Sequence, residues 1–328
     1  MTRVLIIGAG LGGLTLAQGL HAAGVDVAVF ERDRHRTDRL SGYRIHISPK
    51  GSAALHASLP PSVYQRFLDT TGFPSTGFSL FSSDLRELIT LDSREIGLDP
   101  DDPVHSYKSV SRISFRSVLL TGLDDVVSFG KAFTRYALLP DGRVEAFFAD
   151  GSSVVGDVLV GADGVNSGVR AQYLPHLDRI DTGAFAISGK VPLTPSSAGL
   201  LPRQFHIGAA TIMAPHGYSG LAAVHRFRPT TVDSGAHGLL HDNTRDYVMW
   251  NVVTSWANLA KRLDVTRSAV SAMSGSQLRD VVQRNRGRLA PEPARARIDR
   301  RRRHHFGVPV PHVTAPHGVG AERGDAAG

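Results

Sequence analysis

The apolar residues at the start of the chain are arranged in runs that alternate between strand and helix spacing. Residues 4–7 form a continuous run of branched apolar side chains, which is typical of a buried parallel strand. Residues 11–23 follow with leucines at positions 11, 14, 16 and 20, a helical spacing. Residues 25–30 form a second apolar run with strand character. This order predicts a β-α-β unit, from which parallel sheets are built.

Two later regions contain the short alternating runs that predict β-strands. In residues 125–163 the runs are separated by Pro-Asp-Gly and Asp-Gly-Ser turn signals. The last of these runs, residues 157–162, again has the character of a buried strand. Residues 181–256 contain further runs whose spacing suits an antiparallel sheet. In this second region we expect strands at 185–191, 204–214, 220–227 and 247–253.

Helices and short connecting elements account for most of the remaining chain. A strand is expected at 41–47, with Arg44 and His46 on one face, and short strands and loops at 72–110. Either Ser111 or Ser114 is expected to cap a helix near residue 110. Beyond residue 288 the regular pattern ends. The spacing predicts helices at 49–56, 62–68, 109–123, 259–262 and 269–286.

These elements together predict an α/β protein with two domains. The first is a Rossmann-like domain whose parallel sheet is joined by a β-meander, and the second is built on an antiparallel sheet that would bind a substrate. We assign the first domain to residues 1–72 and 108–176, with a C-terminal part at 287–328. We assign the second domain to residues 73–107 and 177–286.

Composition and charge narrow the class of protein. The net charge of +7 is concentrated in residues 279–303, which carry ten arginines and three acidic residues, so the rest of the chain is close to neutral. We therefore expect no nucleic-acid partner. The chain contains no cysteine, which excludes disulfides and cysteine nucleophiles, and its histidines show no metal-ligand spacing. It has no apolar run long enough to cross a membrane and no room for a signal peptide, so we expect a cytoplasmic protein.

A glycine fingerprint stands between the first predicted strand and helix. Gly8, Gly10 and Gly13 occupy the fixed positions of G-x-G-x-x-G. In this motif the first glycine makes a tight turn, the second lets a diphosphate approach, and the third allows the helix to pack closely on the strand. Glu31 ends the second strand, 23 residues after Gly8, where an acid binds a ribose hydroxyl. The pattern predicts a dinucleotide site, and the acid favours an unphosphorylated ribose, as in FAD or NAD.

Two further motifs complete a family pattern. Ser111-Arg112-x-x-Phe115-Arg116 begins the helix near residue 111, and Gly161-Ala162-Asp163-Gly164-x-x-Ser167-x-x-Arg170 follows the last strand of the first region. With the fingerprint, this order resembles the class A FAD-dependent monooxygenases, the para-hydroxybenzoate hydroxylase-like flavoproteins. The resemblance implies FAD as the cofactor and NADPH or NADH as co-substrate. The cofactor-binding residues implied are Gly8, Gly10, Leu11, Gly12, Gly13, Glu31, Arg32, Arg44, Arg112, Asp163 and Gly164.

The resemblance also implies a reaction. A reduced nicotinamide would reduce FAD, and the reduced flavin would use O₂ to hydroxylate an aromatic or polyketide-like small molecule, with the chemistry supplied by the cofactor. No catalytic residue is identified, no metal is expected, and the oligomeric state stays open. Candidates for lining a substrate pocket are Tyr43, His46, Phe205, His206, Tyr247 and Trp250.

The C-terminal residues depart from the family pattern, which leaves alternatives open. The family carries a second motif, G-D-A-x-H followed by P-x-x-G-x-G, whereas here Pro316, Gly318 and Gly320 match only its second half and with altered spacing. We hypothesise that the reading frame shifts after Ala321, which sequencing of the gene tests. A truncated flavoprotein that binds nucleotide without turnover, and a flavin reductase of the same fold, are the alternative functions. A flavin halogenase is disfavoured because its tryptophan-rich signature is absent, and the arginine-rich segment 279–303 could bind polyanions by charge alone.

Overall fold

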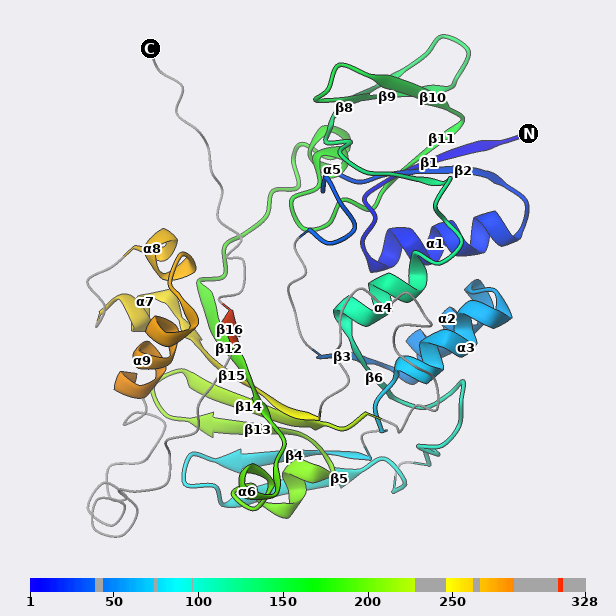
Figure 1. The fold of residues 1–328 in the computed structure, drawn as a ribbon. Helices are drawn as coiled ribbons and strands as arrows, with labels where there is room; N and C mark the ends of the chain where they lie inside the picture. The colour runs from blue at the N-terminus through cyan, green and yellow to red at the C-terminus, as the bar shows by residue number, and fades with distance from the viewer. Residues whose placement is uncertain are drawn as a thin grey trace. The chain divides into compact units, whose positions relative to one another are not determined.

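The computed structural model describes residues 1–38, 44–73, 76–95, 97–227, 246–261, 266–285 and 312–314 (Figure 1). The chain forms two compact units. Of the described residues, the first unit contains Met1–Gly72 and Asp102–Ile180, and the second contains Phe73–Asp101, Asp181–Phe227 and those from residue 246 onward. Among the described helices, none combines the length and hydrophobicity needed to cross a bilayer.

The first unit is organised around a parallel sheet with strand order β11-β1-β2-β7. All neighbouring strands in this sheet run parallel, and the helix α1 (Leu11–Ala22) connects β1 to β2. The predicted β-α-β unit is therefore confirmed. The strands are β1 (Arg3–Ile7), β2 (Asp26–Phe30), β7 (Val127–Ser128) and β11 (Val158–Gly161).

The two faces of β1 are buried against different layers, as its continuous apolar run requires. Val4 and Ile6 pack with α1 and three further helices, whereas Leu5 and Ile7 pack against a β-meander that includes Phe148. These four apolar side chains are each less than 9% exposed, and burial of each contributes roughly 1.5–3 kcal/mol. The helices are α2 (Pro49–Ser58), α3 (Pro61–Thr70) and α4 (Arg112–Leu119), and the meander strands are β8 (Phe133–Leu138), β9 (Val144–Phe148) and β10 (Ser153–Gly156).

A small antiparallel sheet joins β3 (Arg44–Ile47) to β6 (Lys108–Ser111), and it corrects the prediction of a helix over residues 109–123. Residues 109–111 are strand, because their backbone pairs with β3, and the helix α4 begins at Arg112. Ser111 is its N-cap and accepts a hydrogen bond from the Ser114 N–H group. Of the two candidate caps, Ser111 therefore caps α4.

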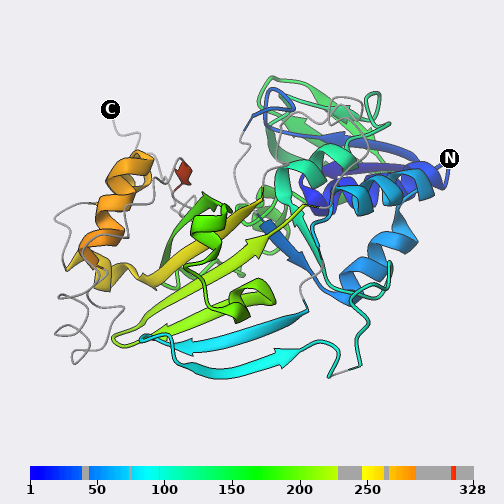
Figure 2. The same ribbon diagram turned by 60° about the horizontal axis from the view of Figure 1, so that its bottom comes forward.

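The second unit contains a seven-stranded sheet with the order β16-β12-β15-β14-β13-β4-β5 (Figures 1 and 2). Every pair in it is antiparallel except β13 with β4. The predicted antiparallel sheet is thus confirmed, but the predicted strand 204–214 begins only at residue 208, because residues 203–206 form a 3₁₀ helix. The strands are β4 (Gly77–Ser82), β5 (Glu87–Asp92), β12 (Ala184–Pro192), β13 (Gly208–Ala214), β14 (Tyr218–His225), β15 (Tyr247–Ser255) and β16 (His312–Thr314).

Helices pack on one face of this sheet, and they correct the prediction of one helix over 269–286. Two helices replace it, because Ser274 starts a new one: its hydroxyl accepts from the Gln277 N–H group at 3.4 Å, and the Gln277 side chain accepts from the Ser274 N–H group at 2.8 Å. This reciprocal pair is a capping box. Leu278 is fully buried in the core beneath these helices. The helices are α7 (Trp256–Ala260), α8 (Arg267–Ser271) and α9 (Gly275–Asn285).

Candidate functional site

The carboxyl ends of three parallel strands bring the predicted site residues together. Gly8 directly follows β1, Glu31 follows β2, and Asp163 comes two residues after β11. The Gly8 N–H group donates to the Phe30 carbonyl at 2.8 Å, which continues the pairing of β1 with β2 past the end of β1. Because neighbouring parallel strands end at the same edge of a sheet, residues far apart in sequence form one site, as in other doubly wound folds.

The three fingerprint glycines and Gly12 divide into two that are required by packing and two that border open space. Gly8 has a φ angle of +109°, and a Cβ atom there would lie 2.5 Å from the Ala162 carbonyl oxygen. A Cβ atom on Gly13 would lie 2.1 Å from the Gly8 carbonyl oxygen. At Gly10 and Gly12, by contrast, a Cβ atom would meet no described atom within 4 Å outside the adjacent residues and the backbone of α1 itself. The open side of the turn is therefore formed by Gly10 and Gly12.

The N-terminus of α1 faces this turn. Gly10 is the N-cap residue in an extended conformation, and within the described part of the chain no side chain caps the helix. The first backbone N–H groups of α1 and its positive dipole end are thus not satisfied by a capping side chain. Leu11 is half-buried and packs against the core of the first unit. This arrangement suits the diphosphate of a dinucleotide.

Glu31 is held rigidly beside the glycine turn. Its side chain is 8% exposed, its Oε2 atom accepts from the Ala9 N–H group at 2.8 Å, and its Oε1 atom accepts from the Asp33 N–H group at 3.0 Å. A carboxylate offers about four acceptor positions, so both oxygens retain capacity for ribose hydroxyl groups. Arg32, the next residue, is exposed.

One carboxylate oxygen of Asp163 binds the first N–H groups of the short helix α5 (Gly168–Tyr173), whose N-cap residue is Ser167. Its Oδ2 atom accepts from the Gly168 N–H group at 2.7 Å and, more weakly, from the Val169 N–H group at 3.3 Å. The Oδ1 atom is buried and has no hydrogen-bond partner among the described residues. Gly164 follows with a φ angle of +80°, which completes the turn. Asp163 thus holds the start of α5 through Oδ2, while Oδ1 can accept a hydrogen bond from a ligand or a water molecule.

Arg44 and Arg112 lie together at the junction of β6 and α4. Arg44 pairs in register with Ser111, the residue before Arg112, and its Nε atom donates to the Ser109 hydroxyl. Arg112 is exposed at the first position of α4. One turn further along α4, Arg116 donates from Nε to the Ala9 carbonyl oxygen at 3.0 Å. Residues four apart lie on the same face of a helix, so Arg112 faces the same side as Arg116.

Sequence reasoning did not assign a role to Arg116, although it stands in the quoted motif. The available signal was its spacing of four residues from Arg112, which places both side chains on one helix face. Its contact with the glycine turn spans 107 residues of sequence, so it depends on the tertiary fold.

The candidate pocket-lining residues are distributed over both units. His46 lies in the first unit and stacks on Tyr107 with ring centroids 4.7 Å apart, and burial, aided by the charge of Arg44, lowers the pKa of His46. Phe205 is buried against Phe81 in the core of the second unit. The other candidates in the second unit are His206, Tyr247 and Trp250, and Tyr43 lies outside the described residues.

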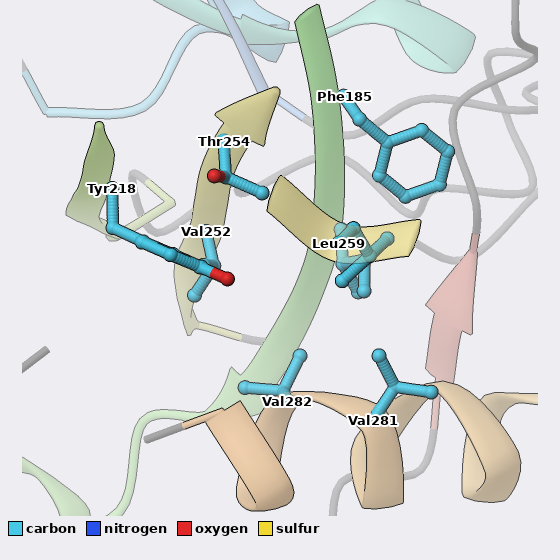
Figure 3. A pocket seen from close by; sticks show the side chains of 8 residues that line it. Phe185, Tyr218, Val252, Thr254, Leu259, Val281 and Val282 are labelled. Atoms are coloured by element: carbon cyan, nitrogen blue, oxygen red, sulfur yellow. The ribbon is translucent and has the colours of Figure 1, made fainter. Parts of the chain in front are cut away.

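A small apolar cavity lies in the second unit between the sheet and α9 (Figure 3). Its volume is about 10 Å³, at the lower limit for a single water molecule, and its lining provides few polar partners for one. None of the candidate pocket residues lines it. It is therefore a packing feature of the second unit. The lining residues are Phe185, Ile187, Tyr218, Val252, Thr254, Leu259, Val281 and Val282.

Comparison of the sequence with known proteins agrees with this geometry. Residues 1–47 match the family described as FAD binding domain. A dual O-methyltransferase/FAD-dependent monooxygenase of Phaeosphaeria nodorum is 38% identical over 205 residues, which are 61% of this chain and 22% of that protein. An FAD-dependent monooxygenase of Trichoderma harzianum is 35% identical over 176 residues, 52% of this chain and 40% of the relative. The matched regions therefore cover less than half of either relative.

A solved structure extends the similarity to almost the whole chain. A protein assigned as an FAD-containing monooxygenase from Photorhabdus luminescens superposes with a TM-score of 0.72 and 27% identity, covering 97% of this chain and 77% of that one. The chain is thus similar in sequence and in fold to FAD-dependent monooxygenases, in agreement with its resemblance to the class A flavoproteins. The α/β fold with a parallel and an antiparallel sheet is shared with this solved structure. The Klebsiella pneumoniae protein HpxO, solved with FAD and uric acid, shares the fold at 21% identity, with a TM-score of 0.61.

All of the predicted cofactor-binding residues lie in the first unit. The glycine turn, Glu31 and Asp163 are gathered at one sheet edge, and Arg112 lies one helical turn from the residue that contacts the glycine turn. The glycine turn and Glu31 lie within residues 1–47, the part of the chain that matches the FAD binding domain family.

Proposed function

We propose that the chain binds FAD at this sheet edge and uses NADPH or NADH and O₂ to hydroxylate an aromatic or polyketide-like small molecule. The observation that carries the proposal is the open, uncapped N-terminus of α1 beside the buried Glu31 carboxylate. The positive dipole end and the free N–H groups of α1 suit a diphosphate, and the adjacent carboxylate of Glu31 suits ribose hydroxyl groups. An acid at this position favours the unphosphorylated ribose of FAD over that of NADP.

Each residue has a defined task in this proposal. The N–H groups at Gly10, Gly12 and Gly13 would bind the diphosphate, and Glu31 would accept from the ribose. The exposed guanidinium group of Arg112 would add positive charge beside the cofactor, as its exposure at the helix start permits. The free Oδ1 atom of Asp163 would accept one further hydrogen bond.

Bound FAD supplies hydride acceptance and oxygen activation, and the protein supplies binding and orientation. A small aromatic compound is the proposed partner. Catalysis depends on excluding water from the reacting groups, which is the general contribution of a closed site.

The visible absorption spectrum of the purified chain tests cofactor binding. Flavin bands that stay with the protein through desalting after FAD is added support the proposal, whereas a colourless protein contradicts it. Glu31→Gln should weaken retention, because one of the two accepted backbone N–H groups loses its partner oxygen. Glu145→Gln is the matched control, since that carboxylate lies on the β-meander and accepts from Ser153.

Turnover is tested separately from binding. Oxidation of NADPH and NADH is followed with aromatic candidates, and the product is weighed by mass spectrometry for one added oxygen atom. Retained FAD with product formation supports the monooxygenase. Retained FAD without NADPH or NADH oxidation would instead support nucleotide binding without turnover, and oxygen-independent reduction of an alkene would support the reductase.

A further inference from the structure

Arg116 joins the two loops that surround the proposed dinucleotide site. Its Nε atom donates to the Ala9 carbonyl oxygen and its Nη1 atom donates to the Arg36 carbonyl oxygen, each at 3.0 Å. The first acceptor belongs to the glycine turn after β1, and the second belongs to the loop that follows Glu31 after β2. The side chain is half-buried, and its guanidinium group lies 6.0 Å from the centroid of the Phe129 ring.

The peptide groups on both sides of Ala9 are fixed by side chains of opposite charge. The Ala9 N–H group donates to Glu31 at 2.8 Å, and the Ala9 carbonyl accepts from Arg116 at 3.0 Å. The structure has no cis peptide bond among the described residues, so the Ala9 carbonyl and the Gly10 N–H group point in opposite directions. Fixing the carbonyl toward Arg116 therefore directs the Gly10 N–H group away from Arg116.

We propose that Arg116 is a positioning residue that orients the Gly10 N–H group toward the diphosphate of the bound dinucleotide. This proposal rests on the proposed function of the site. The space at the Cβ position of Gly10 is open, so a phosphate can approach the backbone of the turn there. The two carbonyl oxygens hold the guanidinium group without cancelling its charge, which favours an anion in front of the turn.

The second contact extends the same support to the ribose side of the site. The Arg36 side chain donates to the Leu120 carbonyl at 3.3 Å and pairs with Asp124 at 2.8 Å, just beyond the C-terminal end of α4. The loop after Glu31 is thus attached to the α4 segment at two points, through the carbonyl and the side chain of Arg36. Of the two arginine side chains, that of Arg116 also binds the glycine turn, through the Ala9 carbonyl oxygen.

Arg116→Gln tests the proposal, with Arg116→Lys and Arg135→Gln as comparisons. Arg135 is exposed on the β-meander over the Phe147 ring, so its loss removes one charge from the same unit without touching the glycine turn. We expect Arg116→Gln to raise the Kd for FAD about 10- to 100-fold, as for loss of charge-assisted hydrogen bonds. Arg116→Lys keeps the charge but not the paired geometry, so it should fall between wild type and Arg116→Gln. Arg135→Gln should bind like the wild type.

The binding of cofactor fragments separates orientation of the turn from general support of the fold. Arg116→Gln should weaken binding of ADP, which has a diphosphate, more than binding of adenosine, which meets only the ribose side of the site. Equal losses for both, or an FAD Kd equal to that of the wild type, would overturn the proposal. If Arg116→Gln does not fold, as judged by circular dichroism without FAD, Arg116→Lys decides by the same comparison. Failure of the wild-type chain to bind FAD would contradict the proposed function itself.

Discussion

Replacement of Gly13 by alanine tests whether the packing of the glycine turn is as close as the structure shows. The added Cβ atom would lie 2.1 Å from the Gly8 carbonyl oxygen and 3.2 Å from the Ala162 Cβ atom. The Gly8 carbonyl oxygen belongs to the backbone and cannot turn aside as a side chain could. The helix α1 and the turn after β1 must therefore move apart. Overpacking of this kind costs about 1–3 kcal/mol or more, and the higher helix propensity of alanine returns up to about 1 kcal/mol. We expect a net loss of about 2 kcal/mol in the free energy of unfolding.

Gly12→Ala provides the matched control because it makes the same chemical change one residue earlier. A Cβ atom at position 12 would meet no described atom within 4 Å outside the adjacent residues and the backbone of α1 itself, so the Gly12→Ala protein should be more stable by up to about 1 kcal/mol. Both variants are unfolded by urea and by heat without FAD, so that cofactor binding does not contribute. For a unit of this size, the loss at position 13 corresponds to a fall in Tm of about 4–8 °C. A Gly13→Ala variant as stable as Gly12→Ala would refute the reasoning.

Four further substitutions test other parts of the structure. Glu31→Gln should cost about 1–3 kcal/mol in urea unfolding, because the amide cannot accept from both backbone N–H groups. Burial and the charge of Arg44 lower the pKa of His46 below 6.5, so the neutral ring stabilises the fold fully above that pH. This contribution is lost as the pH falls through the lowered value, and His46→Gln should show a smaller loss of stability between pH 7.5 and pH 5. Gln18→Ala, which removes two hydrogen bonds to carbonyls at the C-terminal end of α4, should cost about 1–3 kcal/mol in the same urea assay. Leu278→Ala should cost about 2–5 kcal/mol because the side chain is fully buried, and an unchanged urea midpoint would contradict the packing of α9 on the sheet.

The glycine turn and Glu31 could be predicted from the sequence because their requirements are local. Gly8 needs a positive φ angle and follows a buried strand directly, and Glu31 directly follows the next strand of the same β-α-β unit. The two sheets could be predicted for a similar reason, because apolar runs indicate buried strands and turn residues indicate where the chain reverses. In each case the signal lies within a few residues of the feature that it predicts.

Most of the features that the sequence did not predict depend instead on residues far away in the chain. Ser109 has the spacing of a helical residue but forms strand, because β3, more than sixty residues earlier, offers a pairing partner. The role of Arg116 depends on a carbonyl 107 residues away. The break before α9 was the exception, because the capping box of Ser274 and Gln277 is visible in the sequence.

The central position of β1 in its sheet has a consequence for how the protein is made. One neighbour, β2, is synthesised almost at once, but the other lies far along the chain: the Arg3 N–H group bonds to Asp157, 154 residues later. At roughly 5–20 residues per second, a ribosome takes roughly 8–30 s to supply that partner. During this time the apolar β1 strand has one open edge, which is a template for mispairing with other chains. The nascent first unit therefore exposes this edge until β11 emerges, and slower translation upstream of residue 158 lengthens that exposure.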